Sequence, residues 1–148
     1  MFKVLNKYAL HIAFLQAWAA TLGSLYFSEV KGLFPCQLCW YQRILMYPLA
    51  IIFAVAIARK DKNVAYFALP LSIIGAIVAL YHYLIQWTAL REINPIYCSV
   101  INDCSQKQVV YLGFMTIPFF SMLAFLVITF LMLYLINFRG LKGLGIVF

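Results

Sequence analysis

Residues Pro35 to Arg43 read P-C-Q-L-C-W-Y-Q-R, and the interpretation of the whole chain starts from this stretch. Two cysteines, Cys36 and Cys39, stand three positions apart at the beginning of an apolar run. If the run that follows is helical, both thiols lie in its first turn, where unpaired N–H groups and the helix dipole favour a thiolate. Pro35 suits a helix start, because its missing N–H would have had no partner there. Arg43 follows Cys39 by four residues, so the two share a helix face about 6 Å apart along the axis.

The composition around this stretch is that of a membrane protein. Of the 148 residues, 66% are hydrophobic and 10% are charged, whereas about 25% of the residues in soluble domains are charged. The formal net charge is +7, but the basic residues stand in short clusters between apolar runs, as the positive-inside rule expects. We therefore expect one integral membrane domain over residues 1–148 that contacts lipid and has no nucleic-acid partner.

Four apolar runs are each long enough to cross a hydrocarbon layer of about 30 Å, which takes about 20 helical residues. Gly75 and Ala79, like Ala19 and Gly23, have the small-xxx-small spacing that lets membrane helices approach closely. The predicted fold class is an all-α membrane protein, a bundle of four transmembrane helices. The predicted spans are residues 8–27, 38–58, 64–86 and 112–136, each bound being approximate.

The distribution of basic residues predicts the orientation of the bundle. The loops at about residues 28–37 and 88–111 hold three lysines and arginines, which are Lys31, Arg91 and Lys107. The N-terminus, the middle turn and the tail hold seven, which are Lys3, Lys7, Arg59, Lys60, Lys62, Arg139 and Lys142. Both termini are therefore predicted to be cytoplasmic. All four cysteines then lie on or near the outer side, where disulfides form and persist.

The four cysteines form two pairs. Cys98 and Cys104 are close together in one loop, so a disulfide between them is easy to form, and a Cys36–Cys39 disulfide is also feasible. Two redox pairs that face one compartment suggest an electron relay by thiol–disulfide exchange, in which a thiolate attacks a disulfide sulfur. The electrons then need an acceptor in or near the membrane.

Three side chains could bind such an acceptor. Arg43, beside Cys39, could polarise a carbonyl oxygen of a lipid-soluble quinone and stabilise the reduced oxyanion. His82 and Gln86 are four residues apart on one face of the third span, at a depth similar to that of Arg43, and could hydrogen-bond the same ligand. Alone, His82 and Gln86 would be an ordinary polar part of a membrane interface.

Two other classes of function fit the cysteines. Four thiolates could bind zinc, or a soft metal in a metal-handling membrane protein. A cation such as Arg43 is a poor neighbour for a metal centre. The four cysteines could also form two purely structural disulfides that rigidify the loops of a scaffold or a small transporter.

The same stretch, P-C-Q-L-C-W-Y-Q-R, resembles the disulfide bond formation protein B (DsbB) family, and most closely its short Gram-positive type, BdbC. The resemblance covers nearly the whole chain. It includes L-G-S-L-Y-F-S-E before the cysteines, R-I-L-M-Y-P after them, H-Y-L-I-Q in the third span and G-F-M-T-I-P at the start of the fourth. Vitamin K epoxide reductases place their loop cysteines before the C-x-x-C, the reverse of the order in this chain.

The resemblance implies an enzyme, a thiol–disulfide oxidoreductase of the bacterial cytoplasmic membrane with its redox site on the extracytoplasmic side. Such an enzyme reoxidises a thioredoxin-fold oxidase of the DsbA or BdbD type and passes the electrons to a quinone. Carried over to this chain, Cys98 forms the mixed disulfide with the partner, Cys104 relays to Cys36, and Cys39 faces the quinone. Arg43 matches the arginine on the quinone side, and His82 resembles a histidine near the same pocket.

Two features depart from the Gram-negative members of the family. Only five residues separate Cys98 from Cys104, so the membrane-lying helix that those members have between these cysteines does not fit. Gln42 stands where they carry an acid, which changes the charge next to Arg43. The short spacing and the Gram-positive resemblance favour menaquinone over ubiquinone.

Overall fold

A computed structural model describes residues 2–61, 63–87, 110–111 and 115–143. The long elements are four helices: α1 (Phe2–Leu25), α2 (Gln37–Arg59), α3 (Val64–Trp87) and α5 (Ile117–Gly143). A π-helical turn, η1 (Tyr26–Val30), continues α1. Two strands of two residues each, β1 (Val110–Tyr111) and β2 (Met115–Thr116), pair in antiparallel fashion just before α5.

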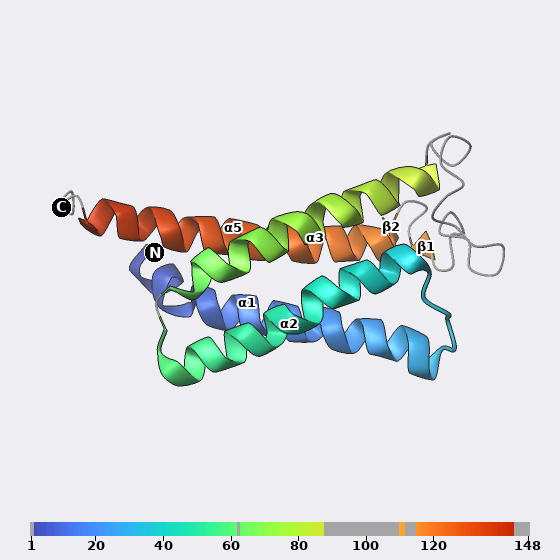
Figure 1. Ribbon diagram of the computed structural model, residues 1–148, viewed down its shortest axis with the longest axis horizontal. Coiled ribbons are helices and arrows are strands. Elements are labelled where there is room, and N and C mark those ends of the chain that lie inside the picture. Colours follow the sequence, from blue (N-terminus) through green and yellow to red (C-terminus); the bar gives the residue numbers. More distant parts are fainter. Residues whose placement is uncertain (1, 62, 88–109, 112–114, 144–148) are drawn as a thin grey trace.

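The four helices form an antiparallel bundle in which each helix packs chiefly against two neighbours (Figure 1). The main contacts join α1 to α2, α2 to α3, α3 to α5 and α5 to α1, so α2 and α5 lie diagonally across the bundle. The start of α1, the turn between α2 and α3, and the end of α5 lie at one end of the bundle. The connection between η1 and α2 lies at the other end, and we call this the cysteine end because it carries Cys36 and Cys39.

All four helices contain a segment long and apolar enough to cross a membrane, namely Tyr8–Val30, Gln37–Arg59, Val64–Trp87 and Ile117–Asn137. Many large apolar side chains point away from the bundle; Leu15, Phe67 and Phe130 are 66%, 64% and 65% exposed. Such a surface suits contact with lipid and not with water. The predicted four-helix membrane bundle is confirmed, with the short β1–β2 ladder as an unpredicted addition.

Small residues fill much of the interior. Ala9, Ala13 and Ala17 recur every four residues on one face of α1 and are fully buried. Because lipid is as apolar as a leucine side chain, burial of large side chains does not drive membrane helices together, and small residues at the contact let the backbones approach. On α3, Gly75 packs directly against the ring of Phe125 from α5, which occupies the place where a Cβ would lie.

Two helix bounds differ from the predicted spans. The first helical segment continues through η1 to Val30, beyond the predicted end at residue 27, because the amides of Lys31 and Leu33 still donate to carbonyls of the last turn. Gly32 then has φ 64°, a left-handed conformation that glycine adopts without steric cost. The fourth helix begins at Ile117, and not at residue 112, so Pro118 stands in its first turn, where its missing N–H costs no hydrogen bond.

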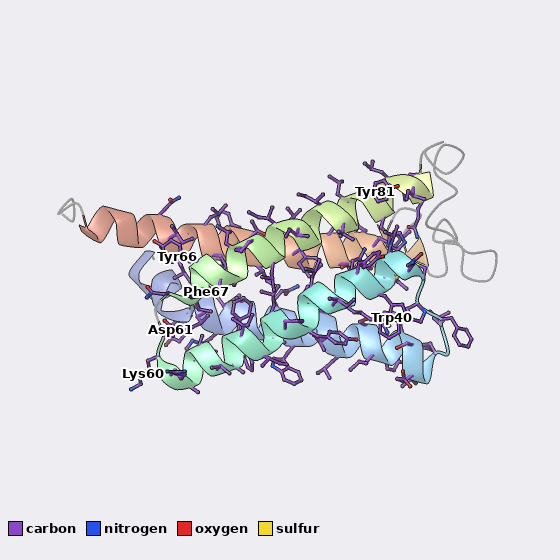
Figure 2. All side chains as sticks on the ribbon, viewed as in Figure 1. Trp40, Lys60, Asp61, Tyr66, Phe67 and Tyr81 are labelled. Carbon is purple, nitrogen blue, oxygen red and sulfur yellow. The ribbon has the colours of Figure 1, made fainter. Side chains whose placement is uncertain are left out.

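Charged side chains lie at the end of the bundle opposite the cysteines, and aromatic side chains lie at both ends, as Figure 2 shows. Lys60 and Asp61 lie at the end opposite the cysteines, in a tight turn where Lys60 is left-handed (φ 53°) and the Asn63 amide donates to Asp61 Oδ1 over 2.8 Å. Trp40 lies at the cysteine end and is 53% exposed. Tyr66, 56% exposed, lies near the charged turn, so aromatic side chains occur at both ends, as at the two interfaces of a membrane.

Candidate functional site

Cys36 and Cys39 lie at the start of α2, but not both inside its first turn. The helix begins at Gln37, and Cys36 is its N-cap, with an extended backbone (φ −69°, ψ 171°) and a carbonyl that accepts the Trp40 amide over 3.1 Å. Pro35 therefore precedes the cap, and the helical residues begin two positions after it. Cys39 is the third helical residue, so its amide belongs to the group of N–H donors that a helix leaves without intrahelical partners.

The two thiols are close together and differ in exposure. The Cys36 Sγ and Cys39 Sγ atoms are 3.2 Å apart, and no disulfide joins them in this structure. Cys36 is buried in a small apolar cluster with Leu38 and Ile85, whereas Cys39 is half-buried. A modest side-chain rotation would bring the sulfurs to the bonding distance of about 2.05 Å, so this geometry suits a pair that opens and closes.

Arg43 is anchored to the end of α1. Its Nε donates to Ser24 Oγ over 2.8 Å and its Nη2 donates to the Ser24 carbonyl over 3.0 Å. Its Cζ lies 5.5 Å from the centroid of the Trp40 ring, which is within range of a cation–π contact. The bonds to Ser24 use two of the five N–H donors of the guanidinium, so the head is held in one orientation with donors remaining for another acceptor.

A cavity of about 400 Å³ lies beside Cys39 and Arg43. It is partly open and is lined by residues of α1, η1, α2, the connection between η1 and α2, and the first turns of α5. Gly23 lines it from α1, and a Cβ added there would meet nothing within 4 Å. Tyr47 lines it from α2, one turn beyond Arg43, and the buried Tyr47 hydroxyl has no hydrogen-bond partner among the described residues. The cavity volume is in the range of small-molecule pockets, about 300–1,000 Å³.

His82 faces the cysteines from α3 and is 1% exposed. Its Nε2 lies 3.6 Å from Cys36 Sγ, and its Nδ1 lies 3.1 Å from Gln42 Nε2. Gln86, one turn further along α3, is half-buried. Among the described residues, neither His82 nor Gln86 lines the cavity, so the structure separates them from the cavity side of Arg43. Cys98 and Cys104 lie outside the described residues.

Three residues of this region carried no role in the sequence prediction. Ser24 anchors Arg43, Gln42 contacts His82, and Tyr47 lines the cavity. Their signal in the sequence is weak. Each is a polar residue inside an apolar span and lies on the same helix face as a cysteine, Arg43 or a small residue. The helix face alone does not say which neighbouring helix it meets.

Comparison with known proteins assigns a family to this arrangement. The family model described as "Disulfide bond formation protein DsbB" matches residues 6–135. The chain is 43% identical over 123 residues to "Probable disulfide formation protein C" of Bacillus cereus, covering 83% of this chain and 88% of the relative. It is 44% identical over 120 residues to "Disulfide bond formation protein C" of Bacillus subtilis, covering 80% and 86%.

A relative outside that genus, "Probable disulfide formation protein" of Coxiella burnetii, is 41% identical over 134 residues, or 90% of each chain. No solved structure matches the chain significantly. The family match, these relatives and the paired thiols at the end of a membrane bundle identify a multi-pass membrane thiol–disulfide oxidoreductase. The chain belongs to the DsbB family of disulfide bond formation proteins.

Proposed function

We propose that this protein reoxidises an extracytoplasmic thioredoxin-fold oxidase of the DsbA or BdbD type and passes the electrons to a membrane quinone. The electrons go from the oxidase to the pair Cys98–Cys104, then to the pair Cys36–Cys39, and then to the quinone. The protein thereby supports disulfide formation in exported proteins. We place it in the bacterial cytoplasmic membrane with both termini cytoplasmic, because the basic residues cluster in the termini and the middle turn.

The observation that carries the proposal is that Cys39 and Arg43 line one cavity. The cavity fits a quinone head group in three respects: its volume of about 400 Å³, its mostly apolar lining, and two polar groups one helical turn apart. Arg43 and Tyr47 are separated by about 6 Å along the helix axis, a spacing comparable to that of the two carbonyl oxygens of a quinone ring. The unpartnered Tyr47 hydroxyl is a hydrogen-bond donor that a ligand carbonyl would satisfy.

Each residue of the site has a role in this scheme. A bound quinone supplies a two-electron acceptor whose carbonyl oxygens gain negative charge on reduction. Arg43, held by Ser24, offers charge-assisted N–H donors toward an oxygen in the cavity without having to reorient. Cys39 presents its sulfur to the same cavity, while the more deeply buried Cys36 lies behind it, 3.2 Å away. As the Cys36–Cys39 disulfide forms, two electrons leave the sulfurs.

The test is quinone reduction by the purified protein with a reduced thioredoxin-fold oxidase as the electron donor. We expect turnover by the unmodified protein and none by Cys39→Ser, with menaquinone a better acceptor than ubiquinone. Absorbance of the quinone reports the reaction. Ser121→Ala, which changes another cavity-lining residue of similar size, is the matched control for a general effect of altering the cavity. An absence of turnover with every quinone would contradict the proposal.

Arg43→Ala tests quinone reduction separately from thiol exchange with the oxidase. Because the guanidinium faces the cavity and Ser24, we expect slower quinone reduction and unchanged formation of the mixed disulfide with the oxidase. Loss of one hydrogen-bond donor to a developing oxyanion typically slows a reaction by about 10²–10³-fold. An equal loss of both steps would show that Arg43 is needed for folding and does not act on the acceptor.

Cys98→Ala tests the assignment of the partner-facing thiol. If Cys98 is the sulfur that joins the oxidase, its removal abolishes the covalent complex that is trapped when the oxidase lacks its resolving cysteine. Cys104→Ala, made in the same way, should still trap the complex. A complex that persists in Cys98→Ala would reassign this role to Cys104.

One observation favours the metal alternative. The ligand atoms of Cys36, Cys39 and His82 all lie within 4.8 Å of one another. This alternative predicts that the reduced protein binds zinc or a soft metal in stoichiometric amount, and that the metal survives purification. Elemental analysis of reduced protein, with oxidised protein as the control, decides between binding and electron relay.

A further inference from the structure

Three buried side chains from two helices form a chain that ends at a reactive sulfur. Gln42 of α2, His82 of α3 and Cys36 at the cap of α2 are 6%, 1% and 5% exposed. Gln42 Nε2 lies 3.1 Å from His82 Nδ1, and His82 Nε2 lies 3.6 Å from Cys36 Sγ. Both ring nitrogens of His82 therefore face protein groups, and the quinone role of this histidine stays a prediction.

The chemistry of these groups determines the direction of the hydrogen bonds. The amide nitrogen of a glutamine side chain donates and does not accept, so Gln42 Nε2 requires a lone pair on His82 Nδ1. A neutral imidazole carries a single N–H, and the partner of one ring nitrogen decides which nitrogen bears it. If His82 is neutral, this hydrogen bond requires its hydrogen to lie on Nε2, the nitrogen that faces the sulfur of Cys36.

We infer that His82 donates a hydrogen bond to Cys36 Sγ and that Gln42 is the positioning residue that holds His82 in the required tautomer. This inference deepens the proposed relay and rests on it. In one step of the relay, Cys36 is joined to another cysteine by a disulfide, and a thiolate attacks the sulfur of that other cysteine. The new S–S bond joins the attacking sulfur to the attacked sulfur, and the bond to Cys36 breaks. The electron pair remains on Cys36 Sγ as a thiolate, and the proton of His82 stays on Nε2.

The surroundings of Cys36 explain why such a donor is needed. Leu38 and Ile85 bury the sulfur, with Tyr81 packed against the same cluster. An anion in apolar surroundings is strongly disfavoured unless it accepts hydrogen bonds, and a thiolate that forms readily is also a better leaving group. His82 faces Cys36, whereas Arg43 lies one helical turn beyond Cys39 and lines the same cavity as Cys39.

The tautomer can be observed directly, because the chain has two histidines, His11 and His82. Full-length protein labelled with nitrogen-15 histidine would be studied by NMR in detergent micelles. We expect His82 to be neutral, with its hydrogen on Nε2. Gln42→Glu, whose carboxylate can only accept, should place a hydrogen on Nδ1. The exposed His11, near the other end of the bundle, should give the same signals in both proteins. A hydrogen on Nδ1 in the unmodified protein, or unchanged His82 signals in Gln42→Glu, would overturn the inference.

A second measurement follows the thiolate. In a protein whose only cysteine is Cys36 (Cys39→Ser, Cys98→Ser, Cys104→Ser), the loss of ultraviolet thiolate absorbance on alkylation gives the thiolate fraction at neutral pH. We expect His82→Phe to lower the ratio of thiolate to thiol about tenfold, the effect of losing one hydrogen bond to a charged group. Gln42→Leu should lower it less, because His82 can still adopt the donating tautomer part of the time.

His11→Phe is the matched control, since it makes the same substitution outside the site and should leave the thiolate fraction unchanged. Because absorbance measures the amount of thiolate, slower access of the alkylating reagent cannot imitate the effect. An unchanged thiolate fraction in His82→Phe would refute the role of His82. Neither measurement uses a quinone or an oxidase, so the failure of this inference is distinguishable from the failure of the proposed relay.

Discussion

The same sequence spacing has opposite consequences in two regions of this bundle. Gly75 and Ala79 on α3, and Ala19 and Gly23 on α1, are both pairs of small residues four positions apart. At Gly75 the ring of Phe125 packs into the place of a side chain and the two helices meet closely. At Gly23 nothing lies within 4 Å of an added Cβ, and the residue lines a cavity of about 400 Å³.

The difference shows that a pair of small residues indicates where a helix lacks side-chain volume. The pair does not predict what occupies the space beside the helix. Between α3 and α5 the space is filled by an aromatic ring of the protein. Between α1 and α2 it remains part of a cavity next to Cys39 and Arg43. Packing therefore stabilises the first region, whereas the second region has a cavity where packing would otherwise occur.

The largest expected effect comes from filling the cavity. Gly23→Phe would place a ring beside Arg43, and we expect quinone reduction to fall about hundredfold, as for a misplaced reactant. Thermal stability in micelles and thiol exchange with the oxidase should be retained. Gly23→Ala is the control and should keep activity, because its Cβ meets nothing within 4 Å. Loss of thermal stability in Gly23→Phe to the same extent as activity would show that this region is packed after all.

A substitution that adds volume in the contact between α3 and α5 should have the opposite effect, which is a loss of stability. Gly75→Ala adds a methyl group where the Phe125 ring lies, and the free energy of unfolding should fall by about 1–3 kcal/mol, as for an overpacked core. Alanine is otherwise the better helix former, so a loss of stability is specific to the clash. Equilibrium unfolding in mixed micelles measures it, and Phe125→Leu in the same chain should recover part of the loss. Unchanged stability of Gly75→Ala would contradict the close contact.

A smaller effect is expected from the hydroxyl of Tyr47. Tyr47→Phe removes the donor that we assign to a quinone carbonyl, and the quinone Kd should rise about fivefold, the value of one neutral hydrogen bond. Tyr41→Phe is the matched control, because Tyr41 lies on the same helix but is 42% exposed and does not line the cavity. Equal Kd values for Tyr47→Phe and the unmodified protein would mean that this hydroxyl does not reach the ligand.

The smallest effect concerns hydroxyl groups within the bundle. Thr129 Oγ1 of α5 donates to Ser72 Oγ of α3 over 3.0 Å, and Thr129→Val should lower the free energy of unfolding by about 0.6 kcal/mol, the average for such bonds between membrane helices. Thr21→Val is the counterpart. The Thr21 hydroxyl is buried without a partner among the described residues, so its removal should leave stability unchanged or raise it. Equal losses of stability in Thr129→Val and Thr21→Val would contradict the expected difference between the two hydroxyl groups.

The sequence predicted the helices more readily than their contacts. Apolar runs of about 20 residues identify membrane helices, because a backbone in lipid must satisfy its own hydrogen bonds. The bounds were harder to predict. Local hydrogen bonding at Lys31 and Leu33 extended the first helical segment, and the strand before Ile117 delayed the fourth.

The candidate site also has a part that the sequence predicted and a part that it did not. Cys39 and Arg43 could be placed on one face because they lie one turn apart on a single helix. The partners of Arg43 and of His82 come from other helices, and the rotation of those helices about their axes is not encoded in local spacing. For that reason the sequence grouped His82 with Arg43 as ligands of one molecule, whereas the structure places it against Cys36 and Gln42.

The sequence by itself determined the membrane class and the number of helices, because these follow from composition and from the length of the apolar runs, and its similarity to known proteins assigned it to the DsbB family. Tertiary structure decided which small residues close a contact and which open a cavity, and it assigned Ser24 to Arg43 and His82 to Cys36. The physical reason is that side chains on different helices meet only once the helices pack. In lipid that packing is decided by shape and by a few polar contacts, and much less by the hydrophobic pattern.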